Sequence, residues 1–142
     1  MKKQSETLKS PCICINLRRT AQKVTEFYDS ALQSVGVSVN QYSLLRNISR
    51  IAGCGTGELA QQVRLEKSTL VRTLQPLLRN GLIVDKSSGT ARRRRLYVTP
   101  AGEDVLAKAL PLWNKAQKDV AVKFGKSYEE LMTIFAEVDL WE

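Results

Sequence analysis

The chain has 142 residues, of which 43% are hydrophobic and 25% are charged, with a formal net charge of +8. It has no apolar run near the roughly 18 residues of a membrane span, and its basic start lacks the apolar core of a signal peptide. It also lacks histidine, and its three cysteines form no Cys-x-x-Cys pair, which excludes histidine-dependent catalysis and the common zinc sites.

The first third of the chain predicts two amphipathic helices. Between residues 16 and 35, apolar side chains recur at steps of three and four, which is the period of a helix with one buried stripe. Gly36 is expected to end this helix. Residues 41–52 repeat the apolar spacing and are followed by Gly53, so a second helix is expected there.

The middle of the chain predicts a helix-turn-helix. Residues 56–63 have the apolar spacing of a short helix, and residues 67–80 that of a longer helix with Leu70, Leu74 and Leu77 facing inward. Residues 64–66 form the turn between them, and Gly81 follows as a C-terminal cap. A short helix, a brief turn and a longer helix make up this motif.

A hairpin and two further helices complete the expected fold. Residues 82–84 and 95–98 resemble strands and flank a polar loop that contains glycine, which is typical of a hairpin. A long helix is expected over residues 103–124. After Gly125, a last helix is expected that Ser127 can cap and that apolar side chains from Leu131 to Trp141 line. The fold class is therefore mainly α, with a winged helix-turn-helix whose small antiparallel wing has two or three strands. The end helices carry more apolar side chains than one small lobe can bury, so we expect a stable homodimer.

The positive charge is concentrated between residues 40 and 100. This segment has eleven basic and three acidic residues, a net of +8, whereas the flanks together have eleven of each and net zero. A cationic middle between neutral flanks is an electrostatic footprint for a polyanion, and double-stranded DNA is the first candidate. The alternative is a solvated polar face on the second helix and a solvated or disordered basic run in the hairpin. Because the helix and the basic hairpin follow each other directly, we favour DNA binding over two unrelated solvated segments.

Candidate DNA-contacting residues lie on two elements. The outer face of the second helix of the motif offers polar donors that suit base edges and phosphates in a major groove. These residues are Lys67, Ser68, Thr69, Arg72 and Thr73. The hairpin adds Arg92, Arg93 and Arg94. Arg92 is nearest to the loop tip, where a guanidinium suits the narrow minor groove, whereas Arg94 and Arg95 suit phosphate or the adjacent helix.

Short sequence elements in a fixed order extend over nearly the whole chain. They are Asn16-Leu17-Arg18-Arg19, Tyr28-Asp29, Gln41-Tyr42-Ser43-Leu44-Leu45, Leu59-Ala60, Ser68-Thr69-Leu70, Arg72-Thr73-Leu74, Pro76-Leu77, Gly81-Leu82-Ile83, Leu96, Val98-Thr99 and Gly102. Together they resemble the MarR family of bacterial winged-helix regulators. The resemblance implies a homodimer with intertwined first and last helices, whose two winged lobes hold a pseudo-palindromic operator.

The resemblance also implies a division of the chain. Residues 1–142 would form one winged-helix domain, with a DNA-binding lobe at 40–100 and dimerisation helices at 10–36 and 101–142. By position, Ser68, Thr69 and Arg72 would contact the major groove and Arg92 would be the wing-tip arginine. Many family members have an aspartate two residues before that arginine. Here the position is Thr90, so the wing arginine is expected to be either less fixed or supported by another group.

Cys12 and Cys14 lie at the start of the first predicted helix, where a hydroperoxide-sensing branch of the MarR family has a reactive cysteine. Helix N-termini and neighbouring arginines such as Arg18 and Arg19 are typical surroundings of reactive thiols. The alternative, which we favour from the sequence, is that both are small buried residues in an apolar segment.

The sequence therefore predicts a sequence-specific DNA-binding transcriptional regulator that acts as a cytoplasmic homodimer. We expect it to be a repressor. An effector of unidentified structure would release it from its operator. No enzymatic activity, metal, cofactor or membrane association is expected. The competing class is a protein whose basic middle binds nucleic acid or acidic partners without sequence preference, which competition with random duplex would distinguish.

Overall fold

The computed structural model describes residues 10–88 and 93–142. Its α-helices are α1 (Ile13–Leu32), α2 (Val39–Arg50), α3 (Thr56–Val63), α4 (Lys67–Arg79), α5 (Pro100–Phe124) and α6 (Tyr128–Val138). Short 3₁₀ turns, η1 (Gln33–Val35) and η2 (Gly125–Ser127), follow α1 and α5. The strands β1 (Ile83–Asp85) and β2 (Leu96–Val98) form an antiparallel pair. The predicted fold class is confirmed.

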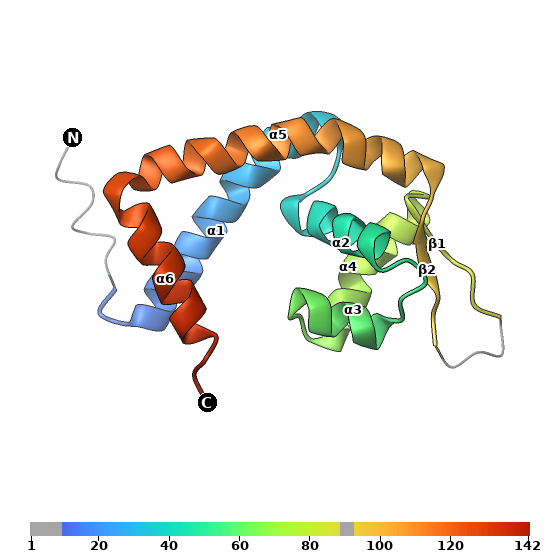
Figure 1. Cartoon of the computed structure of the whole chain (residues 1–142), viewed down its shortest axis with the longest axis horizontal. Helices are drawn as coiled ribbons and strands as arrows, with labels where there is room; N and C mark the ends of the chain where they lie inside the picture. The colour runs from blue at the N-terminus through green and yellow to red at the C-terminus, as the bar shows by residue number, and fades with distance from the viewer. Residues whose placement is uncertain (1–9, 89–92) are drawn as a thin grey trace.

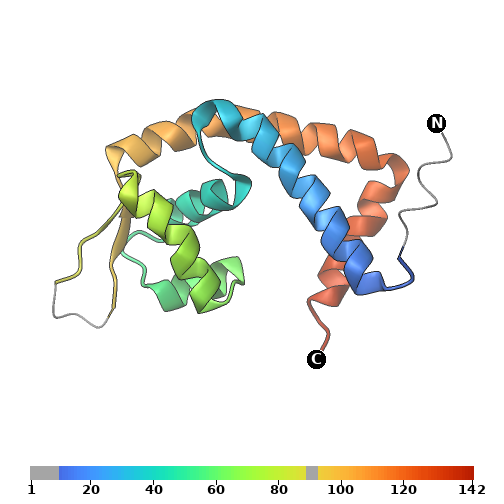
Figure 2. The same cartoon turned by 180° about the vertical axis from the view of Figure 1, so that it is seen from behind.

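Helix α5 runs along one edge of the molecule and joins two groups of elements (Figure 1). Helices α1 and α6 lie on one side, and α2, α3, α4 and the two strands lie on the other. Seen from behind, α1 descends from its contact with α5 at a steep angle (Figure 2). The Tyr28 hydroxyl of α1 donates a hydrogen bond to the side-chain oxygen of Gln117 on α5, which helps to fix this angle.

The lobe formed by α2, α3, α4 and the strands contains a continuous apolar core. The largest fully buried side chains come from α1, α2, α3, α4 and β2, and are Leu32, Leu44, Leu45, Ile48, Leu59, Leu70, Leu74, Leu77 and Leu96. Burying each of them contributes about 1.5–3 kcal/mol relative to leaving it exposed. The inward positions predicted for the second helix of the motif are among them, so its register is confirmed and its polar face must point outward.

The start of α5 is tied to the end of α4 by Thr99. The Thr99 hydroxyl donates to the Gly81 carbonyl at 2.6 Å and accepts from the Gly102 N–H at 3.1 Å, which caps α5. Gly102 is buried against the lobe, and a Cβ placed there would lie 2.1 Å from the Leu82 carbonyl oxygen. Only glycine fits this contact, so α4, the wing and the first turn of α5 form one unit.

The wing is a two-stranded sheet with one additional bridge. Ile83 pairs with Val98, and Asp85 pairs with Leu96. The Gly53 N–H donates to the Leu96 carbonyl at 2.8 Å, and the Leu96 N–H donates to the Cys54 carbonyl at 2.9 Å. Of the two or three strands expected, the described chain forms two, and a single bridge between Cys54 and Leu96 holds the loop between α2 and α3 against the wing.

Helix α6 has an uncovered apolar face. None of its residues is buried, and together with α1 and α5 it lines an apolar groove of about 600 Å³. Phe135 is 49% exposed. The last helix ends at Val138 rather than at Trp141 as predicted, and Leu140 and Trp141 beyond it are 81% and 77% exposed. None of the helices in the described part of the chain has the length and apolarity needed to cross a membrane.

Candidate nucleic-acid interface

Helix α4 presents one polar stripe to solvent. Its buried leucines recur every three or four residues, which leaves Ser68, Arg72, Gln75 and Arg79 exposed at steps of four, three and four on the opposite face. Lys67 is exposed at the first turn, where the free backbone N–H groups of a helix favour anions. Among the described residues, no ion pair involves Lys67 or Arg72. Both cations are therefore available to an external polyanion.

The two threonines predicted for this face are less accessible than its other members. Thr69 and Thr73 are only partly exposed, and the Thr73 hydroxyl donates to the Thr69 carbonyl at 2.9 Å. This hydrogen bond occupies the Thr73 donor but leaves its oxygen able to accept. Thr69 and Thr73 therefore lie at the edge of the stripe, and Ser68 and Arg72 at its centre.

Asp85 organises the base of the wing. Its carboxylate accepts hydrogen bonds from the Arg95 N–H at 3.0 Å and from the Ser87 N–H at 2.9 Å. The bond from Arg95 is the main reason why the pKa of Asp85 lies below its ordinary value; Ser87 and the charge of Arg94 act in the same direction, while burial opposes them. Ionised Asp85 therefore stabilises the fold above its unfolded pKa, and this contribution is lost as the pH falls through the lowered folded value.

The predicted wing arginines differ in their surroundings. Arg93 is exposed, whereas the Arg94 side chain is 33% exposed and its Nε lies 4.0 Å from the Asp85 carboxylate. Arg94 thus points back to the base of the wing, and only part of its guanidinium is available to a ligand. The expectations for Arg92 and Thr90 concern positions outside the described residues.

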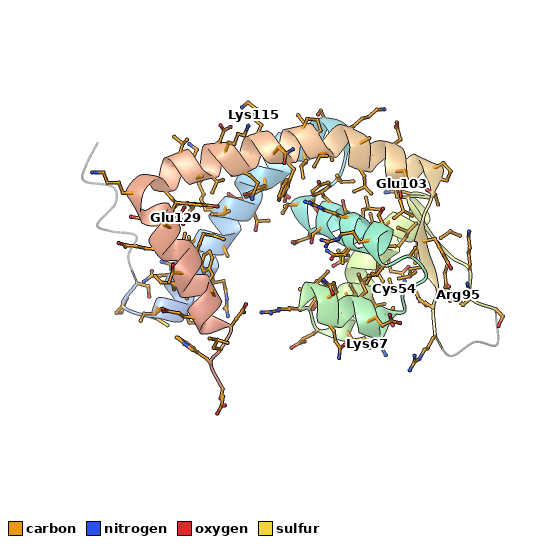
Figure 3. All side chains as sticks on the ribbon, in the orientation of Figure 1. Cys54, Lys67, Arg95, Glu103, Lys115 and Glu129 are labelled. Atoms are coloured by element: carbon orange, nitrogen blue, oxygen red, sulfur yellow. The ribbon has the colours of Figure 1, made fainter. Side chains whose placement is uncertain are left out.

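A second cationic group lies on the other face of the wing. The Lys86 Nζ lies 4.6 Å from the centre of the Tyr97 ring, and the Arg95 Cζ lies 5.8 Å from it. The Arg95 Nη2 also donates to the Tyr97 hydroxyl at 3.0 Å. We call Lys86, Arg95 and Tyr97 the Tyr97 cluster. Figure 3 shows Arg95 on the wing and Lys67 at the start of α4, both on the side of the molecule remote from Glu129 of α6.

Comparison with known proteins identifies the family of this chain. The sequence model of the MarR family matches residues 35–94. The MosR transcriptional regulator of M. tuberculosis, solved in complex with DNA, is 32% identical, with a TM-score of 0.79 over 89% of this chain and 92% of MosR. The chain belongs to the MarR family. The resemblance inferred from the sequence is therefore confirmed.

Two further proteins are similar to this chain, one in sequence and one in fold. A protein of Thauera aromatica, whose name links it to regulation of the hcr operon, is 32% identical over 84 residues. The match spans 58% of this chain and 51% of that protein, about half its length. MarR of E. coli, solved as a variant with operator DNA, is 14% identical, with a TM-score of 0.76 over 91% of this chain and 94% of that one, which shows the fold alone. This chain is a winged-helix transcriptional regulator of the MarR family.

The sequence already suggested Arg95 as a phosphate contact in this MarR-type lobe, but it did not reveal that Lys86 and Tyr97 join it. Arg95 and Tyr97 are two residues apart on one strand, so they share a face, but Lys86 joins them only through the pairing of the strands. Tyr97 lies two positions after Arg95 in the sequence, and this spacing alone could have predicted that the two side chains share a face. No local pattern would have added Lys86.

The cysteines of this MarR-family chain differ from the packing that we expected. Cys12 and Cys14 are both exposed, Cys12 at the N-cap of α1 and Cys14 in its first turn. Burial within the chain is therefore the wrong explanation for them. Cys54 is buried, and this burial, with a smaller effect from Glu58, raises the pKa of its thiol. No three of the described Cys, Asp and Glu side chains are grouped as metal ligands would be.

Proposed function

We propose that this protein is a homodimeric repressor that binds a pseudo-palindromic DNA operator through α4 and the wing of each subunit. The exposed stripe on α4, with Ser68 and Arg72 at its centre and no ion pair to Arg72 among the described residues, carries the proposal. The net charge of +8 between residues 40 and 100 supplies the attraction to a polyanion. The solved complex of MosR with DNA supports the same partner.

Affinity and sequence preference would come from different residues. Lys67, Arg93 and the partly exposed Arg94 suit phosphates, which set affinity and register on the duplex. Ser68 and Arg72, with Thr69 and Thr73 at the edge, suit base edges in the major groove, where arginine pairs with guanine through two hydrogen bonds. The wing-tip role of Arg92 stays a prediction.

Homodimer formation would complete the operator-binding unit. The apolar groove between α1, α5 and α6 and the exposed side chains around it require a cover that the described chain does not provide. A second copy meets this requirement with the same surface, as a twofold axis demands. We expect an interface above roughly 2,000 Å². We propose that residues 10–36 and 101–142 form this interface, as the resemblance to the MarR family implies.

Release from the operator would follow from a change in the separation of the two α4 helices. An effector that binds one arrangement of the lobes more tightly than the other shifts the population toward it. The identity of this effector stays open. Since the ligand of α4 is DNA, the expected location remains the cytoplasm.

The proposal is tested by selecting genomic fragments with the purified full-length chain. We expect a small set of fragments that share an inverted repeat and stay bound in the presence of excess shuffled duplex. Recovery of fragments without a common sequence, all displaced by the shuffled duplex, would instead support the competing class, a protein that binds nucleic acid without sequence preference.

Replacing one arginine of α4 and one arginine of the wing by alanine should change DNA binding in different ways. Arg72→Ala should weaken operator binding by about 1–3 kcal/mol and relax the preference at one base position in each half-site. Arg92→Ala should weaken binding to all sequences alike and reduce the dependence of affinity on salt. Titration against single-base operator variants at several salt concentrations separates these effects. Unchanged base preference in Arg72→Ala would show that Arg72 does not contact a base.

The exposed cysteines allow a test of redox sensing. If Cys12 or Cys14 is a sensor, an organic hydroperoxide should oxidise it and lower operator affinity of the wild type. The measurement compares wild type and the Cys12→Ser/Cys14→Ser variant, each with and without the hydroperoxide. Because both residues lie in the segment 10–36 that we assign to the dimer, we expect packing against the second copy to explain them and the hydroperoxide to leave binding unchanged in both proteins. Equal behaviour of the two proteins would exclude a redox switch at these positions.

A further inference from the structure

The Tyr97 cluster has a fixed aromatic centre. The Tyr97 hydroxyl lies against the loop between α2 and α3, where Gly53 has a φ of +83° and a Cβ would be only 2.9 Å from the hydroxyl oxygen. The Gly53 N–H is itself bonded to the carbonyl of Leu96, the neighbour of Tyr97. The ring is therefore held by the body of the lobe and does not depend on the outer part of the wing for its position.

Two cations from different strands are attached to this ring. Lys86 follows β1 and Arg95 precedes β2, and the Lys86 N–H donates to the Arg95 carbonyl at 2.9 Å, so the two residues face each other across the hairpin. Lys86 approaches the ring, and Arg95 both approaches the ring and donates to its hydroxyl. Contacts of this kind limit the rotamers of two long side chains that would otherwise move freely in water.

The charge of the cluster is not neutralised within the described chain. None of the ion pairs among these residues includes Lys86 or Arg95, and both side chains are exposed. Arg94, by contrast, points to the opposite face of the hairpin and lies near Asp85. The hairpin thus has one face with an internal counter-charge at its base and one face that displays two positive charges outward.

From this arrangement we infer that the Tyr97 cluster is a phosphate-binding site for the DNA backbone, in which Tyr97 is a positioning residue for Lys86 and Arg95. The inference rests on the proposed operator binding and extends it to the face of the wing opposite Arg94, where Lys86 and Arg95 lie. A phosphate backbone is the matching ligand, because it offers a row of negative charges and needs no base recognition. Ordering the two cations before binding reduces the entropy lost on contact.

The test measures affinity at several salt concentrations for two labelled duplexes, one recovered in the fragment selection and one with the same bases shuffled. Lys86→Gln and Arg95→Gln should each reduce the slope of log affinity against log salt by about 1 per wing, on both duplexes. Tyr97→Leu keeps both charges but frees them, and should weaken binding to both duplexes by about 2- to 5-fold. Tyr97→Phe, which loses only the hydroxyl, should have a smaller effect.

Two controls separate positioning from general damage. Lys118→Gln removes the same charge from an exposed position on α5 and should leave the salt slope unchanged. Tyr97→Leu should have no further effect on affinity in a Lys86→Gln/Arg95→Gln background, because a positioning residue acts only through the groups that it positions. An equal loss in that background would overturn the positioning role of Tyr97.

The outcomes also separate this inference from the proposed function. Wild-type protein that binds neither duplex would contradict operator binding itself. Wild-type protein that binds normally, with salt slopes unchanged in Lys86→Gln and Arg95→Gln, would leave operator binding intact and overturn the phosphate site on the wing.

Discussion

Replacing Phe135 with aspartate is expected to convert the protein into a monomer and to weaken operator binding by about 100- to 10,000-fold. Phe135 lines the apolar groove between α1, α5 and α6 and is 49% exposed in the single chain. If a second copy covers it, a carboxylate at this position would be buried without a partner charge, which is strongly unfavourable. In a dimer, binding of one lobe to its half-site holds the second lobe close to the other half-site, and a monomer loses this gain in affinity. Sedimentation and DNA titration measure the two effects.

The matched control for this variant is Thr133→Asp. Thr133 lies on the outer side of α6, is exposed and does not line the groove, so the same negative charge should leave the dimer intact. A wild type that sediments as a monomer at micromolar concentration would contradict the proposed dimer. So would a Phe135→Asp variant that stays dimeric.

The second large effect is expected at Gly102. Gly102→Ala should lower the free energy of unfolding by about 3 kcal/mol or more, as an overpacked site does when its neighbours cannot relax. The added Cβ would lie 2.1 Å from the Leu82 carbonyl oxygen and 2.6 Å from the Val98 Cγ1, and the former is backbone. Urea denaturation followed by circular dichroism measures the change.

Gly57→Ala serves as the control for Gly102→Ala. Gly57 lies in α3, has no positive φ, and has no atom within 4 Å of a Cβ placed there. Because alanine favours the helix, this variant should be more stable than the wild type by about 0.4–1 kcal/mol. If Gly102→Ala unfolded at the same urea concentration as the wild type, the close contact between α5 and the wing would not be present in solution.

The sequence was sufficient to predict elements whose burial follows a local period. The bounds of α3 agree with the predicted 56–63, and the leucine spacing of α4 gave its inward face. The last helix was predicted to extend to Trp141 because its apolar period continues, yet α6 ends at Val138. Apolar spacing reports which side chains seek burial, and here the surface that would bury Leu140 and Trp141 is not part of the described chain.

The residues of the candidate site also fall into those that a local period predicts and those that it does not. Ser68 and Arg72 could be predicted because a helix period alone places them on one face. Arg94 and Arg95 are neighbours on one strand, so alternation alone places them on opposite faces. The contacts of Arg94 with Asp85 and of Lys86 with Tyr97 depend instead on the register of the hairpin, which the sequence did not specify. The exposure of Cys12 and Cys14 was missed because it depends on where α1 loses its packing partners.

The connection made by Thr99 has a geometrical consequence for operator choice. Since α4, the wing and the first turn of α5 move as one unit, the 25 residues of α5 act as a lever about 37 Å long. A tilt of about 5° at its far end displaces the lobe by about 3 Å, which is close to the 3.4 Å step between adjacent nucleotides of a DNA strand. A bend of this size in α5 would therefore move α4 by about one base-pair step along the DNA.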